Sequence, residues 1–557
     1  MAYVITQNCC SDAACVKACP VNCIHPTPGE PEYGSADMLF IDPDTCIDCG
    51  ACADACPVDA IRSDRSLAAN DLPFVELNAS YYRQRPISPT WLPTPRLVDT
   101  TTTPGSLRVA VVGAGPAGHY TVEELLKYPA VVVEWFDRNP AAGGLVRSGV
   151  APDHADTKRA LDQFKFPPAK ARRLNMHFGV EVGVDIDHTE LLDFHHAVIY
   201  CSGAAIGPRL DVPGADLIGN HAAVDLAGWY NGHPDRASTS VDLASERAVV
   251  IGNGNVALDV ARILTMSPDM LATTDIADHA LEVLRGSTVR EVVVLGRRGP
   301  GQAAFTYPEL LGLTGVAGVQ VRVTPECLAR SQPGAGATSS NLSLLHSLSQ
   351  QPSDPNAKHI VLAFDTEIER IDGSGRVERV TVRQRGGSDG VDRSETLAAG
   401  LVVHSIGVRG SAVRGVPFDE QTSRIPNREG RVYLPDTDAT MNGVYVAGWA
   451  KRGPVGVIGT NKECARHTVA SVIEDFTCGV LRRTVGTSGA LAELVRSRCA
   501  GVVDADGWRA IDITERARGG VAGRPRVKFT SQAELVNTSR TAHGMAGRVR
   551  SALTRRA

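Results

Sequence analysis

The sequence predicts an α/β protein with two Rossmann-like dinucleotide-binding domains behind a small cysteine-rich α+β domain. Three observations support this fold class. A cysteine cluster lies at the N-terminus, and two separate glycine fingerprints each stand between a strand pattern and a helix pattern. The length of 557 residues leaves room for three or four domains.

The cysteine-rich region has the spacing of two iron–sulfur clusters. Nine of the 14 cysteines fall between Cys9 and Cys56. The second half of the region is the complete bacterial run, in which the fourth cysteine ligates the other cluster, and the first half repeats it with Asp in place of the second cysteine. The two runs are Cys46-x2-Cys49-x2-Cys52-x3-Cys56-Pro57 and Cys9-x2-Asp12-x2-Cys15-x3-Cys19-Pro20.

The repeat predicts two ligand sets. One is Cys19, Cys46, Cys49 and Cys52, and it predicts a stable [4Fe–4S] cluster; the other is Cys9, Asp12, Cys15 and Cys56. A carboxylate is a harder ligand than a thiolate and holds iron less firmly, so the second set predicts [3Fe–4S] or a labile [4Fe–4S] cluster. Each set joins three closely spaced ligands to a fourth cysteine from the other run. This arrangement fits iron–sulfur clusters better than a disulfide framework or a zinc site.

We expect the cluster domain to span residues 1–65 and a Pro/Thr-rich linker to span residues 66–106. The first 65 residues hold ten acids and three bases, a charge of −7, against 52 acids and 54 bases in the rest. Five prolines fall between Arg85 and Ser106, so an extended tether is expected there, long enough for the cluster domain to swing. The acidic surface favours electrostatic docking.

The first fingerprint predicts a flavin-type nucleotide site. A strand pattern ends at Gly113, and Gly113, Ala114, Gly115 and Gly118 follow at the spacing that brings a helix N-terminus to a pyrophosphate. An acid near the end of the next strand holds the ribose. Glu134 and Asp137 both qualify by spacing.

The second fingerprint predicts an NADP(H) site. Gly254, Asn255 and Val256 follow the strand pattern 248–251, and the next strand pattern ends in Arg297 and Arg298 instead of an acid. Two arginines at that position suit a 2′-phosphate. With clusters attached, the expected pair is FAD and NADPH, because a flavin converts hydride into single electrons. The polar stretch 331–358 predicts a loop.

These motifs together resemble the adrenodoxin reductase family of ferredoxin–NADP reductases, fused behind a bacterial-type ferredoxin. The resemblance covers residues 107–480 and is most specific at 143–154, 254–262, 297–309 and 448–459. It implies that Asp137 is the ribose acid and that His154 and Glu309 lie near the nicotinamide. It further implies that FAD is lined by Gly144, Leu145, Trp449, Gly456, Val457 and Ile458, and that NADP is held by Asn255, Val256, Arg297, Arg298 and Glu309.

The resemblance implies an enzyme, a ferredoxin–NADP reductase with a built-in ferredoxin. Its FAD domain would span 107–205 and 400–557, and its NADP domain 206–399. Hydride passes from NADPH to FAD, and single electrons then pass through the clusters to an acceptor protein such as a ferredoxin or cytochrome. The alternative is an electron-feeding subunit similar to the glutamate synthase small subunit.

Composition excludes some other classes of protein. No apolar stretch reaches the length of a membrane span, and no signal peptide pattern is present, so a cytoplasmic enzyme without a membrane or nucleic-acid partner is expected. The C-terminal tail from Arg516 holds ten bases and one acid. We expect it to be a solvated segment.

Overall fold

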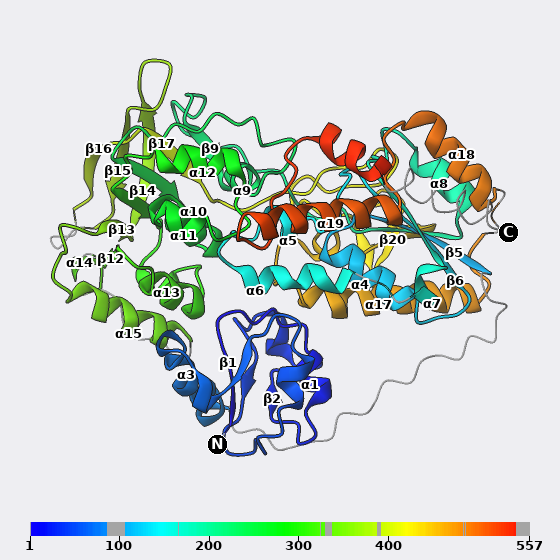
Figure 1. The fold of residues 1–557 in the computed structure, drawn as a ribbon, viewed down its shortest axis with the longest axis horizontal. Coiled ribbons are helices and arrows are strands. Elements are labelled where there is room, and N and C mark those ends of the chain that lie inside the picture. The colour runs from blue at the N-terminus through cyan, green and yellow to red at the C-terminus, as the bar shows by residue number, and fades with distance from the viewer. Residues whose placement is uncertain are drawn as a thin grey trace.

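The computed structural model describes residues 2–85 and 106–541, apart from 165, 167, 324, 329–336, 387–390, 483 and 485. It contains a small N-terminal domain and two larger α/β domains (Figure 1). Within the described ranges, no helix combines the length and the hydropathy that crossing a bilayer requires. Part of the expected linker, 86–105, and the end of the basic tail, 542–557, lie outside the described residues.

The N-terminal domain is built from two similar halves. Helices α1 (Ala14–Ala18) and α2 (Ala51–Ala55) start 37 positions apart. The left-handed residues Ser11, Ala13 and Asn22 recur at the same offset as Asp48, Gly50 and Asp59. The sheets are two short antiparallel pairs: β1 (Tyr3–Ile5) with β4 (Ile61–Ser63), and β2 (Ile24–His25) with β3 (Phe40–Ile41). The sequence repeat is therefore also a backbone repeat.

Helix α3 (Pro73–Gln84) corrects the predicted start of the linker. It lies inside the expected tether 66–106 but packs on the N-terminal domain. The Asn78 amide bonds the backbone of Ile5 and Ile41, and the Tyr82 hydroxyl donates to the carbonyl of Cys23. A helix tied to both strand pairs belongs to the domain, so any tether begins after it.

The first large domain is a seven-stranded sheet in the order β18-β19-β20-β8-β5-β6-β7. The strands from β20 to β7 are parallel. Helices α4 (Pro116–Leu125) and α17 (Thr460–Thr477) pack against each other and on the sheet. The strands are β5 (Leu107–Val112), β6 (Val131–Asp137), β7 (Leu174–Phe178), β8 (Ala197–Tyr200), β18 (Asn427–Arg428), β19 (Arg431–Tyr433) and β20 (Thr440–Val446).

The second large domain is a six-stranded parallel sheet in the order β12-β13-β11-β10-β17-β9. An antiparallel sheet of β14 (Thr366–Asp372), β15 (Arg379–Gln384) and β16 (Arg393–Ala398) adjoins it. The six strands are β9 (Asn220–Ala222), β10 (Arg247–Ile251), β11 (Glu291–Leu295), β12 (Val319–Val323), β13 (Lys358–Ala363) and β17 (Leu401–His404). Its main helices are α9 (Ala223–Tyr230), α10 (Asn255–Thr265), α12 (Asp278–Arg285) and α13 (Tyr307–Thr314).

Two expectations about this domain are wrong. The predicted boundary at residues 399/400 would assign β17 to the FAD domain, but β17 pairs with β10 and β9 inside the six-stranded sheet. The chain crosses back later, beside the outgoing connection, where Ile206 pairs with Arg409. The polar stretch 331–358 contains helix α15 (Ala337–Ser349), which packs through Leu345 and Leu348 on the domain core.

The N-terminal domain lies against both large domains (Figure 1). Leu311 of α13 packs on its core. On the other large domain, the Gly459 amide donates to the Cys10 carbonyl over 2.8 Å. The structure thus shows a docked domain where the tether led us to expect a swinging one.

Candidate functional site

The first fingerprint forms a close turn between β5 and α4. Gly113 has φ +111°, a conformation that favours glycine. A Cβ on Gly118 would stand 1.8 Å from the Gly113 carbonyl oxygen, so only glycine lets the helix pack this closely. The backbones of Gly115 and Gly144 also meet, since a Cβ on Gly144 would stand 2.8 Å from the Gly115 Cα. This cradle of bare backbone fits the pyrophosphate of a dinucleotide.

Two acids, Glu134 and Asp137, have the spacing of a ribose-binding residue, and only Asp137 contacts the fingerprint turn. Glu134 is buried and bonded to His177 (2.6 Å) and Asn175 (2.9 Å). Asp137 ends β6 and accepts from the Ala114 amide over 2.6 Å. Burial raises the pKa of Asp137 above its ordinary value. Its position beside the turn supports the expectation drawn from the resemblance.

The segment 448–459 closes over the same turn. A Cβ on Gly448 would lie 2.4 Å from the Ala117 Cβ, so this backbone touches the start of α4. Trp449 begins α16 (Trp449–Arg452), and its Nε1 is buried without a hydrogen-bond partner among the described residues. A buried donor without a partner fits a site that receives a polar ligand such as FAD. Gly456, Val457 and Ile458 follow in the same loop.

The second fingerprint lies at the carboxyl ends of β10 and β11. Asn255 begins α10, and its Oδ1 accepts from the Thr306 amide over 2.8 Å, which ties the fingerprint to the segment after β11. Val256 is 46% exposed at this surface. Arg297 and Arg298 are exposed and form no ion pair with another described residue. Two free guanidinium groups beside a helix N-terminus fit a phosphate ligand.

His154 and Glu309 come from different domains and meet 3.8 Å apart, Nε2 to Oε2. Arg262 of α10 lies between them, with Nη2 2.7 Å from His154 Nε2 and Nε 2.6 Å from an Asp153 oxygen. Burial raises the pKa of the Glu309 carboxyl. Among the described residues, Arg262 Nη1 and Glu309 Oε2 have no hydrogen-bond partner although both are buried. The two atoms face each other at 3.8 Å, too far apart for a hydrogen bond, so they fit a polar ligand group at the domain junction.

Three members of this cluster were not assigned a role from the sequence: Asp153, Asp259 and Arg262. Arg262 also bonds Asp259 one turn earlier on α10, over 2.6 Å. The two residues stand three positions apart in a helix pattern, which is a weak signal for an ion pair. Their partnership with His154 depends on the packing of two domains, and residue spacing within one helix does not reveal it.

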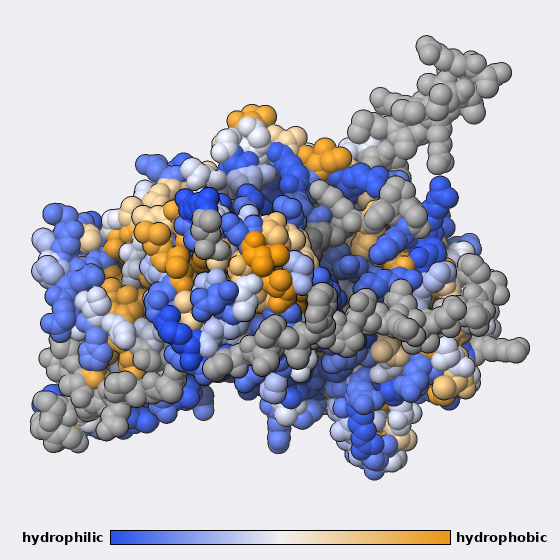
Figure 2. Space-filling view, turned by 90° about the horizontal axis from the view of Figure 1, so that it is seen from below, coloured by the Kyte–Doolittle hydropathy of each residue, from blue (hydrophilic) through white to orange (hydrophobic). Residues whose placement is uncertain are grey.

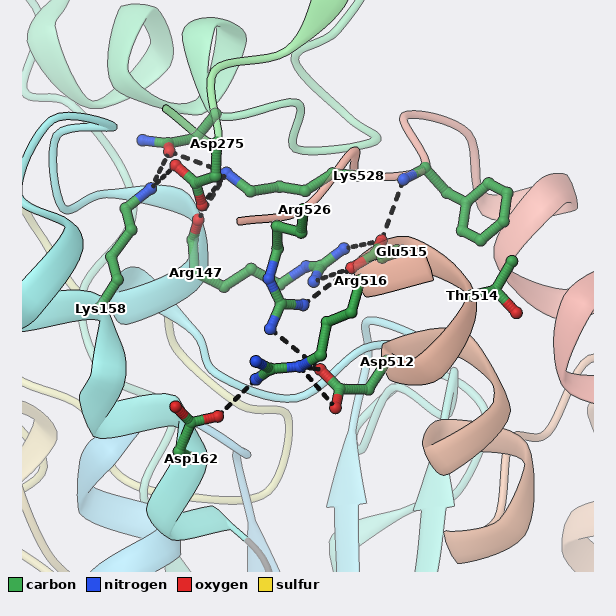
Figure 3. A network of polar contacts seen from close by, with 12 residues as sticks. Arg147, Lys158, Asp162, Asp275, Asp512, Thr514, Glu515, Arg516, Arg526 and Lys528 are labelled. Atoms are coloured by element: carbon green, nitrogen blue, oxygen red, sulfur yellow. Dashed lines mark hydrogen bonds and ion pairs between the residues drawn. The ribbon is translucent and has the colours of Figure 1, made fainter. Parts of the chain in front are cut away.

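A buried polar network holds the segment that carries His154 (Figure 3). In its first half, Arg147 donates to Glu515 over 2.8 Å and Arg526 donates to the same carboxylate over 3.0 Å. In its second half, Lys158 and Lys528 pair with Asp275 over 2.7 and 2.9 Å. Helix α19 (Ala505–Val521) and the residues after it therefore tie the His154 segment to both large domains.

One expected cluster site is a surface pocket. It contains all four of its predicted ligands, Cys19, Cys46, Cys49 and Cys52. Two backbone amides point at ligand sulfurs: Cys23 N–H donates to Cys19 Sγ over 3.4 Å and Asp48 N–H to Cys46 Sγ over 3.5 Å. Cys23, which has no ligand place in the motif, lines the same pocket. Four sulfurs around one pocket fit an iron–sulfur cluster.

The other expected set is interior. Cys15 is buried and Cys9 and Cys56 are half-buried, and the latter two pack in one apolar cluster with Ile458. Asp12 has the backbone place of Cys49 in the repeat, but its carboxylate is engaged elsewhere. One oxygen lies 3.1 Å from Lys462 Nζ and the other accepts from the Ala14 amide over 3.2 Å. The three cysteines make weaker contacts: Cys56 Sγ accepts from the Ala60 amide over 3.3 Å, and Cys9 Sγ lies 4.0 Å from Ser11 Oγ. Because only Asp12 is held in an ion pair, the site fits three cysteine ligands better than three cysteines and a carboxylate.

Comparison with known proteins gives matches for both halves of the chain. A family model described as a 4Fe-4S binding domain matches residues 39–62, and one described as pyridine nucleotide-disulphide oxidoreductase matches residues 107–292. A probable ferredoxin/ferredoxin–NADP reductase of Mycobacterium leprae is 47% identical over 547 residues, 96% of this chain and 97% of that protein.

Two further matches concern the large domains. The NADPH-ferredoxin reductase FprA of Mycobacterium leprae is 43% identical over 458 residues, 78% of this chain and 98% of that protein. The solved structure of Mycobacterium tuberculosis FprA in complex with NADPH is 40% identical, has a TM-score of 0.72, and covers 78% of this chain and 99% of that one. The fold of the two large domains therefore has a solved counterpart.

Proposed function

The chain belongs to the family of ferredoxin/ferredoxin–NADP reductases, and we propose how its residues divide the work of that reaction. When bound, FAD accepts a hydride from NADPH and releases electrons singly, which joins a two-electron donor to one-electron iron–sulfur centres. The observation that supports the proposal is the contact of His154 with Glu309, because it joins the two large domains at one polar junction.

The turn 113–118 would hold the FAD pyrophosphate at the N-terminus of α4. Asp137 would accept from the ribose hydroxyls, and Gly144 and Leu145 would cover the opposite side of the turn. Trp449 and the loop Gly456–Ile458 would line the flavin. The orphaned Trp449 Nε1 and the closeness of Gly448 to α4 support this assignment.

Arg297 and Arg298 would bind the 2′-phosphate of NADPH and so select it over NADH. Asn255 and Val256 would hold the nucleotide at the start of α10. His154 and Glu309 would orient the nicotinamide, since hydride transfer depends on alignment more than on proton transfer. The Arg262 guanidinium supports that role, because it holds His154 and the neighbouring Asp153 in place.

In the N-terminal domain, Cys19, Cys46, Cys49 and Cys52 would bind a [4Fe–4S] cluster. Cys9, Cys15 and Cys56 would bind [3Fe–4S] or a labile [4Fe–4S] cluster, because Asp12, at the second position of the run, is paired with Lys462. The external acceptor would be a one-electron protein such as a ferredoxin or a cytochrome. The fused relatives, which match along nearly their whole length, favour an independent reductase over a feeding subunit.

Anaerobic reduction by NADPH tests the proposal. The purified holoenzyme should lose flavin absorbance, then cluster absorbance, and develop the EPR signal of a reduced [4Fe–4S] cluster. It should reduce cytochrome c without any added subunit. A chain that binds NADPH but passes no electrons to a protein acceptor until a partner subunit is supplied would instead be a feeding subunit.

A further inference from the structure

The docked N-terminal domain presents its two cluster sites in opposite settings. The apolar cluster that contains Cys9 and Cys56 also contains Val146 and Ile458, which belong to the large FAD-side domain. The other site opens to solvent, where Cys49 is exposed and Ile47 is 58% exposed. One ligand set is therefore internal to the molecule and the other is at its surface.

The internal contact is closely built. The Gly459 amide donates to the Cys10 carbonyl, and a Cβ on Gly459 would stand 2.2 Å from the Asp12 backbone nitrogen. The buried Asp12 carboxylate pairs with Lys462 over 3.1 Å, and the Lys462 ammonium also lies 5.9 Å from the Tyr120 ring centre. A glycine-only approach and a largely buried ion pair are features of a permanent interface, since a surface contact needs neither.

Further contacts hold the domain on both neighbours. Asn8 donates to Asp156 over 3.0 Å, and Arg159 pairs with Asp59 over 3.3 Å. Leu311 of α13 packs from the NADP-side domain. Contacts with both large domains fix the orientation of the N-terminal domain as well as its position.

From this geometry, and resting on the proposed function, we propose that the N-terminal domain is a docked relay with a fixed spatial order. One electron at a time enters through the Cys9–Cys15–Cys56 site, which lies against Gly456–Lys462. It leaves through the Cys19–Cys46–Cys49–Cys52 site to an external one-electron acceptor protein. Asp12 then serves the interface, as the partner of Lys462, and not the cluster. Lys462 and Gly459 are positioning residues for internal transfer.

The exit site carries an exposed apolar side chain. Viewed from the side on which this domain lies, apolar atoms gather near the middle of a largely hydrophilic face (Figure 2). The exposed large apolar side chains of the N-terminal domain are Ile47, Leu72 and Val75. Ile47 stands between two expected ligands, Cys46 and Cys49, so an acceptor that covers it reaches the exposed cluster site.

Two interface variants of the intact holoenzyme test the docking. Lys462→Glu replaces the ion pair with Asp12 by two neighbouring negative charges. Gly459→Ala is compatible with the local backbone, φ −73° and ψ −25°, but clashes with the N-terminal domain. Both variants should speed hydrogen exchange in peptides 8–16 and 456–462 at least fivefold and slow NADPH-driven bleaching of the clusters. The controls are Arg209→Glu, in an exposed ion pair, and Gly489→Ala, where an added Cβ would stand 3.9 Å from the nearest atom.

Ile47→Ala tests the order, because it removes the exposed apolar side chain without adding a charge beside the cluster site. It should slow reduction of cytochrome c at least fivefold, and any change in cluster bleaching by NADPH should be smaller. If Ile47→Ala slows bleaching as much as cytochrome c reduction, or if Lys462→Glu and Gly459→Ala alter neither exchange nor bleaching, the relay is wrong. Flavin absorbance and NADPH–ferricyanide turnover confirm that each variant retains its flavin half. If the unmodified enzyme shows no bleaching by NADPH at all, the proposed function fails, whereas the exchange data still decide the docking.

Discussion

At the scale of residues, we propose that the two arginines at the end of β11 decide coenzyme choice. Arg297 and Arg298 stand exposed and without a carboxylate partner among the described residues, so their charge is available to a ligand. Charge-assisted hydrogen bonds to the 2′-phosphate are worth about 1.5–3 kcal/mol each. The sequence predicted this role because the residue after the second strand of a Rossmann unit contacts the 2′ position of the bound ribose.

Replacing Arg297 and Arg298 with Gln should therefore raise the KM for NADPH at least about tenfold, which corresponds to roughly 1.4 kcal/mol. The KM for NADH should remain nearly unchanged, because that coenzyme has no 2′-phosphate. Steady-state kinetics with ferricyanide as acceptor measures both. Arg322→Gln, an exposed arginine on β12 of the same domain, is the control. Equal losses with both coenzymes would make the pair structural.

Asp12 is the residue at which pattern and structure differ most. It occupies a ligand place in the motif and the matching place in the backbone repeat, yet its carboxylate is bonded to Lys462. A cluster with only three thiolates loses its fourth iron readily. A cysteine at this place would supply the missing sulfur.

Asp12→Cys should convert the first cluster into a durable [4Fe–4S] form. Iron analysis and EPR after mild oxidation measure the change: the unmodified protein should show the [3Fe–4S] signal and the variant should not. Eight irons that survive oxidation in the unmodified protein would contradict the labile site. Asp48→Cys, two positions from Cys46 but outside the ligand pattern, should leave the iron content as it is.

At the scale of elements, the tail from Arg516, which its charge predicted to be solvated, is partly built into the fold: its first residues complete α19, and Arg526 and Lys528 are buried. Glu515 is fully buried and serves two arginines, one from the His154 segment and one from its own end of the chain. The sequence shows only a basic segment after Arg516. Arg147 lies 368 positions from Glu515, so no local pattern reveals that pair.

Glu515→Gln should destabilise the protein by about 3–5 kcal/mol, because Arg147 and Arg526 would remain as buried charges without a carboxylate. The denaturant midpoint, followed by flavin release, measures the loss. Glu493→Gln, an exposed acid on α18 (Ser488–Arg498), should change it by less than about 0.5 kcal/mol. A midpoint unchanged by Glu515→Gln would mean that the network contributes no net stability.

The same network predicts a loss of stability in acid. Burial alone would raise the pKa values of Glu515 and Asp275, but their cationic partners outweigh burial and hold both pKa values below the ordinary range. The unfolded chain therefore binds more protons, so stability rises with pH through that window and falls as pH drops below about 4. Denaturant midpoints between pH 7 and pH 3 should show this fall, and Glu515→Gln should show a smaller one.

At the scale of the whole molecule, the arrangement of the domains matters more than the tether between them. The interface at Gly459 and Lys462 brings Cys9 and Cys56 against Ile458 of the loop that we propose to line the flavin, without any swinging motion. A docked domain predicts transfer that does not depend on protein concentration. If the domain swings instead, electron transfer should depend on protein concentration once the chain is cut.

Cutting the holoenzyme at a protease site introduced at Thr101 should therefore leave the two halves associated. They should co-elute in size exclusion at low salt, and cluster bleaching by NADPH should not slow on tenfold dilution. Raised salt should weaken the association, because the exposed ion pairs of the interface are screened. Halves that separate at low salt, with bleaching that slows on dilution, would restore the swinging mechanism.

Local patterns determined much of this protein in advance. Cysteine spacing, two glycine fingerprints and an arginine pair depend on positions a few residues apart, so the fold class, the family and the nucleotide turns could be predicted from them. Tertiary structure alone decided which side chains meet across domains. Examples are the contact of Arg262 with His154 and the pairing of Asp12 with Lys462. Tertiary structure also assigned β17 to the second sheet and α3 to the first domain. Such contacts join residues up to 450 positions apart, and only the packing of buried surfaces brings them together.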